Sequence, residues 1–192
     1  MIPVQSSIPI PSDFTERVSV YNQPLVDYEN GGPNLGEQTN DVSYEWAAAS
    51  DGTSVWVFRE NVDPVVVLED EDISQISFAF DQLMNPHIGY VSQGIVKLYW
   101  WDTLASVYET MVLSGVRNPR LCTDEKNPLF TGDRDIIFAY IKGTDLCLRI
   151  QRDRFNTEYV FASGISQRSV LSAVCMNKGR RLQFQLVTPP LN

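Results

Sequence analysis

The sequence predicts an all-β protein of repeated antiparallel β-hairpin units, β-propeller-like in arrangement, with a β-sandwich as the alternative. Short runs rich in β-branched and aromatic residues recur from residue 41 onward, and turn residues separate them. No segment carries a convincing helical pattern, and even residues 104–113 consist largely of strand-favouring residues. The hairpins recur at roughly 35–50 residues, which is the period of propeller blades.

The predicted hairpins share one pattern. The first strand contains a small residue, a polar turn follows, and the second strand alternates apolar and polar residues. The small residues are Ala48, Gly89, Ala139 and Ala173. Small residues let neighbouring backbones approach closely near a propeller axis. The hairpins are expected to join residues 46–49 to 55–59, 88–91 to 96–100, 138–141 to 146–150, and 173–175 to 182–186.

Residues 73–161 read as two successive rounds of about four short strands each. The first round is expected at residues 76–80, 87–91, 95–101 and 107–112, and the second at 120–122, 136–141, 146–150 and 158–161. A propeller needs four or more blades to close. This chain supplies two full units and two partial ones, so a small ring closes only if the first and last units complete each other. A curved sheet or a sandwich is the other outcome.

Residues 1–40 are predicted to form an extended Pro-rich N-terminal arm, and residues 41–192 the all-β repeat domain. Proline removes a backbone donor, so neither a helix nor a central strand is expected in the arm, although residues 18–21 suit a short strand. The apolar residues of the arm alternate with prolines and serines, as in a segment that lies on another surface. These residues are Ile2, Val4, Ile8 and Ile10. The arm either covers its own domain, or is disordered, or docks on a neighbouring subunit.

The first strands of the repeat domain follow from Asp41. Residues 43–49 are predicted to form a strand, which Asp51-Gly52, a strong hairpin turn pair, follows. Residues 55–59 are predicted to form the antiparallel return strand. Residues 64–68 begin at a proline and are nearly all apolar, which predicts a buried strand that starts at the position where proline is tolerated.

The net charge and the cysteine content limit the classes of ligand and the cellular compartment that we expect for this protein. The net charge of −9 argues against tight binding of nucleic acid and against an anionic membrane surface. The 3 cysteines have no CxxC spacing, which indicates buried free thiols rather than disulfides or a zinc site. Neither a signal-peptide pattern nor a bilayer-spanning apolar run is seen, so folding in a reducing cytosol is expected. No metal and no cofactor is predicted.

Candidate chemistry in the sequence is sparse, and we expect no enzyme. Residues 69–72 form an acidic run that could ligate calcium, but a solvated loop is the better interpretation. His87 is the only histidine, which leaves no catalytic triad. Residues 50–56 are a near miss to the Asp-box turn of sialidase-like propellers. The carboxylates that could form a glycosidase pair by residue type alone are Asp124, Glu125, Asp133 and Asp135.

Tyr99, Trp100 and Trp101 form an aromatic run that could stack on a sugar or a base. In an alternating strand the two tryptophans face opposite ways, so one belongs to the core and the other is partly exposed. The exposed one serves an interface as readily as a ligand. Together with Ile2, Val4, Ile8 and Ile10, these aromatic residues make up the predicted interface.

Several segments resemble blade segments of tailed-bacteriophage virion proteins. They are residues 94–102, 135–141, 146–155, 158–159 and 179–186. The resemblance covers roughly residues 44–187 and is nearest to nozzle-like and tail-accessory components. It implies a structural part that is assembled in the host cytoplasm and carried in the virion, usually as a ring of copies. It carries over no catalytic residues, and the chain is smaller than the long nozzle proteins.

Two functions are therefore expected. The first is a non-enzymatic structural component of a phage tail or head-to-tail region that assembles with copies of itself and with other virion proteins. The alternative is a carbohydrate-binding module, or a glycan-degrading enzyme, involved in host surface recognition. The second function requires an exposed aromatic residue and acidic residues in one cleft.

Overall fold

The computed structural model describes residues 12, 16–19, 25–26, 43–44, 46–59, 62–81, 85–124, 135–176 and 181–190. The all-β prediction is confirmed, and the strands form antiparallel sheets of hairpin-like units. The described strands do not form a closed barrel, and a closed propeller is not shown. No described helix has the length and apolar character needed to cross a bilayer.

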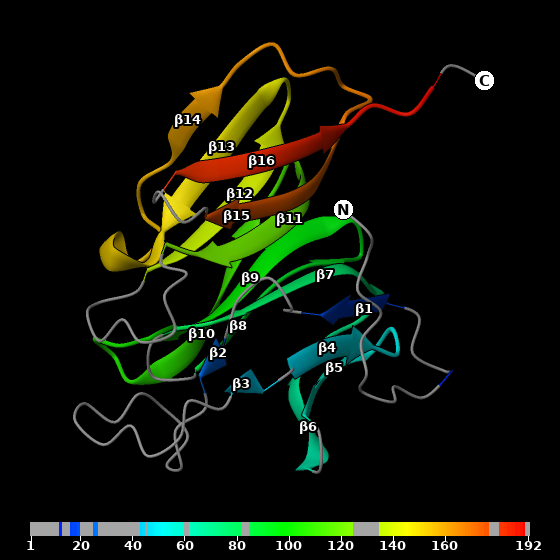
Figure 1. Cartoon of the computed structure of the whole chain (residues 1–192), viewed down its shortest axis with the longest axis vertical. Helices are drawn as coiled ribbons and strands as arrows, with labels where there is room; N and C mark the ends of the chain where they lie inside the picture. Colours follow the sequence, from blue (N-terminus) through cyan, green and yellow to red (C-terminus); the bar gives the residue numbers. More distant parts are fainter. Residues whose placement is uncertain are drawn as a thin grey trace.

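Three four-stranded antiparallel sheets follow one another along the chain, and a two-stranded hairpin comes last (Figure 1). The first sheet contains β1 (Glu16–Ser19), β4 (Trp46–Ser50), β5 (Ser54–Arg59) and β6 (Val62–Glu69). The second contains β7 (Ile73–Phe80), β8 (Pro86–Ser92), β9 (Ile95–Asp102) and β10 (Val107–Leu113). The third contains β11 (Val116–Thr123), β12 (Ile136–Lys142), β13 (Asp145–Ile150) and β14 (Tyr159–Ala162).

The remaining elements are short. The last hairpin joins β15 (Val170–Met176) to β16 (Leu182–Val187), and β2 (Leu25–Val26) pairs with β3 (Ser43–Tyr44). Within the described residues, one 3-10 turn, η1 (Gln151–Asp153), follows β13. All four predicted hairpins are present in register, as β4–β5, β8–β9, β12–β13 and β15–β16.

The sheets pack face to face in chain order, with a hydrophobic core in each gap. Successive side chains of a strand point to opposite faces, so one strand serves two cores. Along β8, Ile88 and Tyr90 face the first sheet, whereas Val91 faces the third. The core between the second and third sheets includes Leu98, Trp100, Leu121, Ile136, Phe138, Tyr140 and Phe155. The core between the third sheet and the last hairpin includes Ile137, Ile141, Leu146, Leu171, Val174 and Met176.

Gly89 shows why one hairpin strand needs a small residue. A Cβ atom at Gly89 would lie 3.0 Å from the Phe138 ring and 3.4 Å from Cβ of Pro119. Both neighbours belong to the third sheet, so the backbone of β8 approaches that sheet directly. A larger residue at this position would push the two sheets apart.

The prediction of a buried strand at residues 64–68 was wrong. β6 is the edge strand of the first sheet, and Val65 is 59% exposed while only Leu68 of these residues is buried. Pro64 fits there because an edge strand tolerates a missing donor. An apolar run by itself does not distinguish an edge strand from a central one.

Part of the predicted arm lies within the described residues. β1 and β2 both fall inside residues 1–40, and β1 pairs with β4 at the edge of the first sheet, close to the short strand expected at 18–21. The interface residues Ile2, Val4, Ile8 and Ile10 lie outside the described residues. The division into an arm and a domain stays a prediction.

Candidate functional site

The two neighbouring tryptophans of β9 have different environments. Trp100 is buried between the second and third sheets, where its ring meets Phe155 edge-on at 5.2 Å. Trp101 is half-buried and contacts Tyr108 at 5.0 Å. The sequence predicted one core tryptophan and one partly exposed one, and the structure assigns Trp100 to the core. Trp100 is therefore unsuited to an interface.

Tyr99, Tyr108 and Trp101 form an aromatic face on the second sheet. Tyr99 stacks on Tyr108 with ring centroids 4.6 Å apart and planes within 6°, and Trp101 lies across the strand pair from Tyr108. Burial raises the pKa of both tyrosines, and the phenol of Tyr99 also raises that of Tyr108. The phenols therefore stay neutral, and the face can offer apolar contact or stacking. Tyr108 was missed in the sequence because the pairing of its strand with residues 95–101 was not predicted.

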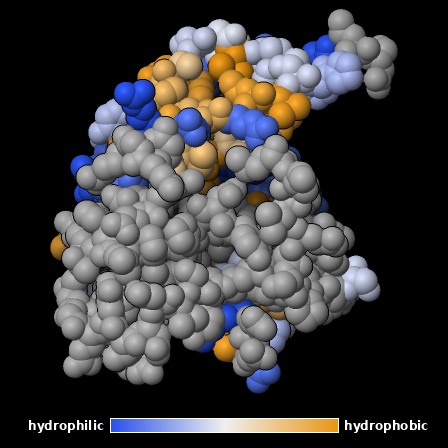
Figure 2. All heavy atoms as spheres, in the orientation of Figure 1, coloured by the Kyte–Doolittle hydropathy of each residue, from blue (hydrophilic) through white to orange (hydrophobic). Residues whose placement is uncertain are grey.

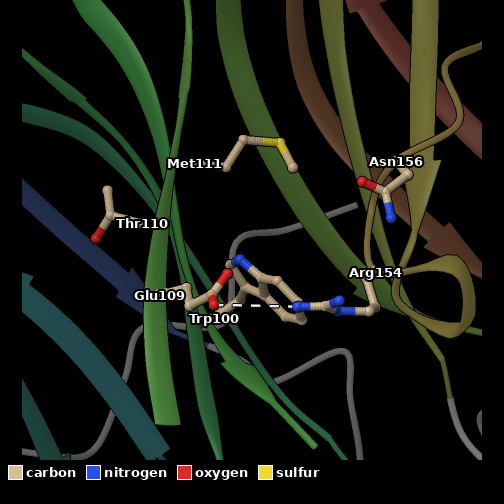
Figure 3. A pocket seen from close by; sticks show the side chains of 6 residues that line it. All are labelled: Trp100, Glu109, Thr110, Met111, Arg154 and Asn156. Atoms are coloured by element: carbon tan, nitrogen blue, oxygen red, sulfur yellow. Dashed lines mark ion pairs between the residues drawn. The ribbon is translucent and has the colours of Figure 1, made fainter. Parts of the chain in front are cut away.

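A pocket of about 260 Å³ opens on the other face of this strand pair, against the segment that follows η1. It is lined by Trp100, Glu109, Thr110, Met111, Arg154 and Asn156 (Figure 3). Figure 3 shows Glu109 and Arg154 facing each other across the pocket, with 4.0 Å between the closest atoms of the pair, while the side chain of Thr110 points away. The pocket thus combines a carboxylate, a guanidinium and an aromatic wall.

Arg154 is anchored to Asp102, which is buried. The Asp102 carboxylate also accepts hydrogen bonds from the amides of Leu104 and Ala105. Burial favours the neutral acid, but these amides and Arg154 together hold the pKa of Asp102 below its ordinary value. Arg154 has a left-handed backbone, with φ of 59°. Asp102 therefore holds the turn after β9 and ties the second sheet to the third.

His87 also links these two sheets. Its ring is buried, with Nε2 at 3.1 Å from the Gln151 side-chain amide and Nδ1 at 3.0 Å from the Asn85 carbonyl. Gln151 accepts a hydrogen bond from the Ile136 amide, so its NH2 group donates to His87 and Nδ1–H donates to Asn85. Burial lowers the pKa of His87, and the charge of Asp81 opposes this. The only histidine in the sequence is therefore a neutral bridge between sheets.

The acidic run at residues 69–72 is tied to the second sheet by Asp70. Lys97 Nζ lies 2.7 Å from the Asp70 carboxylate, and the Tyr90 hydroxyl donates to the same oxygen at 2.9 Å. Burial alone would raise the pKa of Asp70, but Lys97, the Glu71 amide and Tyr90 lower it to about 2. No group of three metal-ligating side chains gathers among the described residues.

A second polar network centres on Glu158. Its carboxylate accepts hydrogen bonds from Tyr140 at 2.6 Å and Lys142 at 2.7 Å, and Arg149 donates to the Tyr140 hydroxyl at 2.8 Å. The bonds from Lys142 and Tyr140 lower the pKa of Glu158. Arg149 also binds the carbonyls of Phe155 and Asn156, so the network fixes the segment between η1 and β14.

The other predicted carboxylates hold turns. Asp51 accepts hydrogen bonds from the Thr53 and Ser54 amides at 2.8 and 2.7 Å, which makes it the organising residue of the β4–β5 turn. Asp124 and Asp135 both contact Arg152 and therefore form a structural ion-pair group. Glu125 and Asp133 lie outside the described residues. Cys122 and Cys147 are buried free thiols, and Cys175 is free and half-buried.

Exposed apolar side chains gather on β14 and β16. Tyr159, Val160 and Phe161 are 45%, 58% and 54% exposed, and Leu186 and Val187 are 37% and 46% exposed. Phe161 contacts Phe184 of β16 at 4.4 Å, so the two strands meet there, whereas Val160 pairs with Cys147 and points to the opposite face of the third sheet. Figure 2 shows hydrophobic atoms exposed in the upper part of the molecule, where Figure 1 draws β14 and β16. The three consecutive apolar residues of β14 are the sequence feature that could have indicated this exposed apolar surface.

Comparisons with known proteins yield no match. No protein-family model matches the chain, and neither does any curated protein or any solved structure. Three features of the described residues remain as candidate sites: the aromatic face, the Glu109–Arg154 pocket, and the apolar surface of β14 and β16.

Proposed function

We propose that this chain is a non-enzymatic structural component of a bacteriophage virion, in the tail or head-to-tail region. It assembles in the host cytoplasm with copies of itself and with adjacent tail proteins. The observation that carries the proposal is the apolar surface between β14 and β16, where Tyr159, Phe161 and Leu186 are exposed and Phe161 contacts Phe184. Contiguous exposed apolar surface marks protein interaction sites.

The polar chemistry of the described residues supports the same function. The hydrogen bonds of three polar side chains connect strands, turns or sheets to one another. These side chains are His87, Asp102 and Asp70. Such contacts suit a rigid part that keeps its shape under load. The resemblance to phage blade segments adds the setting, a ring of copies within the tail.

The test is the mass of the purified protein by light scattering, with two matched variants. Phe161→Asp changes a 54% exposed residue of β14 that contacts Phe184 of β16, and Val65→Asp changes a 59% exposed residue of β6. We expect the wild type and Val65→Asp to form the same defined oligomer, and Phe161→Asp to dissociate because a buried interfacial charge is costly. A wild type that stays monomeric at high concentration would contradict self-assembly.

The aromatic face favours the carbohydrate-binding alternative, because half-exposed rings stack on sugars. A glycan screen with wild type and Trp101→Ala separates the two functions. Trp100→Ala is not a suitable probe, since its side chain is buried and its loss would affect folding. A glycan bound by the wild type and lost in Trp101→Ala would favour the binding module, whereas a screen without ligands would favour the structural component.

A further inference from the structure

The Glu109–Arg154 pocket is built from two parts of the chain that are distant in sequence. On one side, Glu109 of β10 lies directly opposite Trp100 of β9, and Met111 follows two residues later on the same face. On the other side, Arg154 and Asn156 come from the segment after η1. The pocket therefore uses the face of the β9–β10 pair that is opposite to the aromatic face.

The position of Arg154 is held by contacts within the protein itself. Arg154 and Phe155 both have left-handed backbones, with φ of 59° and 57°, although neither is a glycine. Such conformations persist only where the surrounding structure holds them, and they cluster at ligand sites. Here Arg154 pairs with the buried Asp102, and the buried Phe155 ring packs against Trp100. The guanidinium is therefore preorganised at the edge of the pocket.

Asn156 directs an acceptor toward the pocket. Its Nδ2 donates to the Asp153 carbonyl at 2.7 Å, and its own carbonyl accepts from Arg149 at 2.9 Å. A carbonyl can only accept, so the NH2 group faces Asp153 and Oδ1 faces the other way. Figure 3 shows Oδ1 of Asn156 on the side of Met111. Among the described residues this oxygen has no hydrogen-bond partner, which leaves it available to a ligand.

The charges around the pocket favour a neutral ligand. The Asp102–Arg154 pair cancels, and Glu109 adds a negative charge 4.0 Å from Arg154. An anion would meet Glu109, a cation would meet Arg154, and either would lose the hydration of a full charge. A hydroxyl group both donates and accepts. Two neighbouring hydroxyls can therefore accept from Arg154 and donate to Glu109 or Asn156 at the same time.

The size and the apolar lining of the pocket limit the ligand further. Its volume of about 260 Å³ lies just below the range of roughly 300–1,000 Å³ typical of sites for drug-sized ligands. One six-membered ring is therefore the appropriate size. Met111 and Trp100 offer apolar contact to C–H groups, and the unbranched thioether of Met111 adapts to irregular shapes. A ring with neighbouring hydroxyls and apolar C–H groups is a pyranose.

We propose that the Glu109–Arg154 pocket binds one neutral pyranose ring of a carbohydrate. Arg154 donates to one hydroxyl, and Glu109 and Asn156 accept from its neighbours. The inference does not rest on the apolar surface of β14 and β16, so the result of the light-scattering test neither supports nor removes it. It adds a binding activity to the structural role and gives the carbohydrate-binding alternative a site other than the aromatic face.

Ligand-observed saturation-transfer NMR of the full-length protein tests the ligand class, because it works for a monomer and for an oligomer. The probes are the methyl glycosides of glucose, galactose and mannose, with cyclohexanol and glycine as comparison ligands. We expect at least one glycoside to bind saturably at millimolar concentration, and both comparison ligands to bind at least tenfold more weakly. No saturable binding of any glycoside would overturn the proposal, and so would cyclohexanol or glycine binding as tightly as the best glycoside.

Two neighbouring residues of β10 provide a matched test of the site. The side chain of Glu109 faces the pocket, whereas that of the next residue, Thr110, points away from it (Figure 3). We expect Glu109→Ala to weaken glycoside binding at least tenfold, because a hydrogen bond to a charged group is lost. Thr110→Ala should change the affinity less than twofold, and both variants should unfold at the wild-type temperature.

Trp101→Ala completes the set, because Trp101 belongs to the aromatic face. We expect it to leave the affinity for the glycoside within twofold of the wild-type value. Loss of binding in Trp101→Ala with full binding in Glu109→Ala would place the sugar on the aromatic face and overturn the proposal. Equal effects of Glu109→Ala and Thr110→Ala would overturn it as well.

Discussion

The gap between the second and third sheets and the gap between the third sheet and the last hairpin are built differently. In the first of these gaps, packing around Phe138 is joined by polar contacts that also cross it. His87 meets Gln151 at 3.1 Å, and the Leu121 amide donates to Ser77 Oγ at 2.9 Å. The last hairpin is held by an apolar core and by arginines that bind backbone carbonyls, as Arg120 does with Ser172 at 3.0 Å.

The difference between the two gaps indicates which region has a fixed geometry and which region has apolar side chains left exposed. Directional contacts in the middle fix one relative position of two sheets, because buried polar groups must find their partners. The hairpin uses one face for packing and leaves β16 with exposed apolar residues. The middle of the stack thus serves stability, and its end carries the exposed apolar side chains on which the proposed assembly rests.

The largest expected effect contrasts the two gaps directly. Phe138→Ala should lower the free energy of unfolding by about 3–5 kcal/mol, because the side chain is fully buried and leaves a cavity. Phe184→Ala, at a half-buried position of β16, should cost about 1–2 kcal/mol. Urea unfolding of both variants measures the two values. Equal losses would show that the hairpin is as tightly built as the middle.

A smaller effect is expected where the backbone of β8 meets the third sheet. Gly89→Ala should cost about 1–3 kcal/mol, because its new Cβ would lie 3.0 Å from the Phe138 ring. The double variant with Phe138→Leu should cost less than the sum of the two single changes, since the smaller side chain makes room. Strict additivity in urea unfolding would refute a direct clash between these two residues.

The smallest effect concerns pH. Burial lowers the pKa of His87 below its ordinary 6.5, so the unfolded chain takes up a proton at a higher pH than the folded one. Stability should therefore be full above pH 6.5 and fall below it, by at most about 1.4 kcal/mol per pH unit. His87→Gln should remove the slope between pH 6.5 and 5. Asp70, with a pKa lowered to about 2, loses its contribution only below pH 3.8, outside this window.

Sequence reasoning succeeded where period-two alternation decides the outcome. It placed the four hairpins, and it required Trp100 and Trp101 to face opposite ways. It failed for residues 64–68, because apolar content is the same for a buried strand and for an edge strand such as β6. It also left open which tryptophan is buried, since alternation defines two faces without saying which one meets another sheet.

The sequence by itself determined the strands, their turns and the presence of a buried face, because these depend on neighbouring residues. Turn residues such as Asp51 and Gly52 act over a few positions, and so does the alternation of apolar side chains. Only the tertiary structure decided that Asp102 meets Arg154, that His87 meets Gln151 and that the β15–β16 hairpin packs on the third sheet. Those partners lie far apart in the chain, and the packing of whole sheets brings them together.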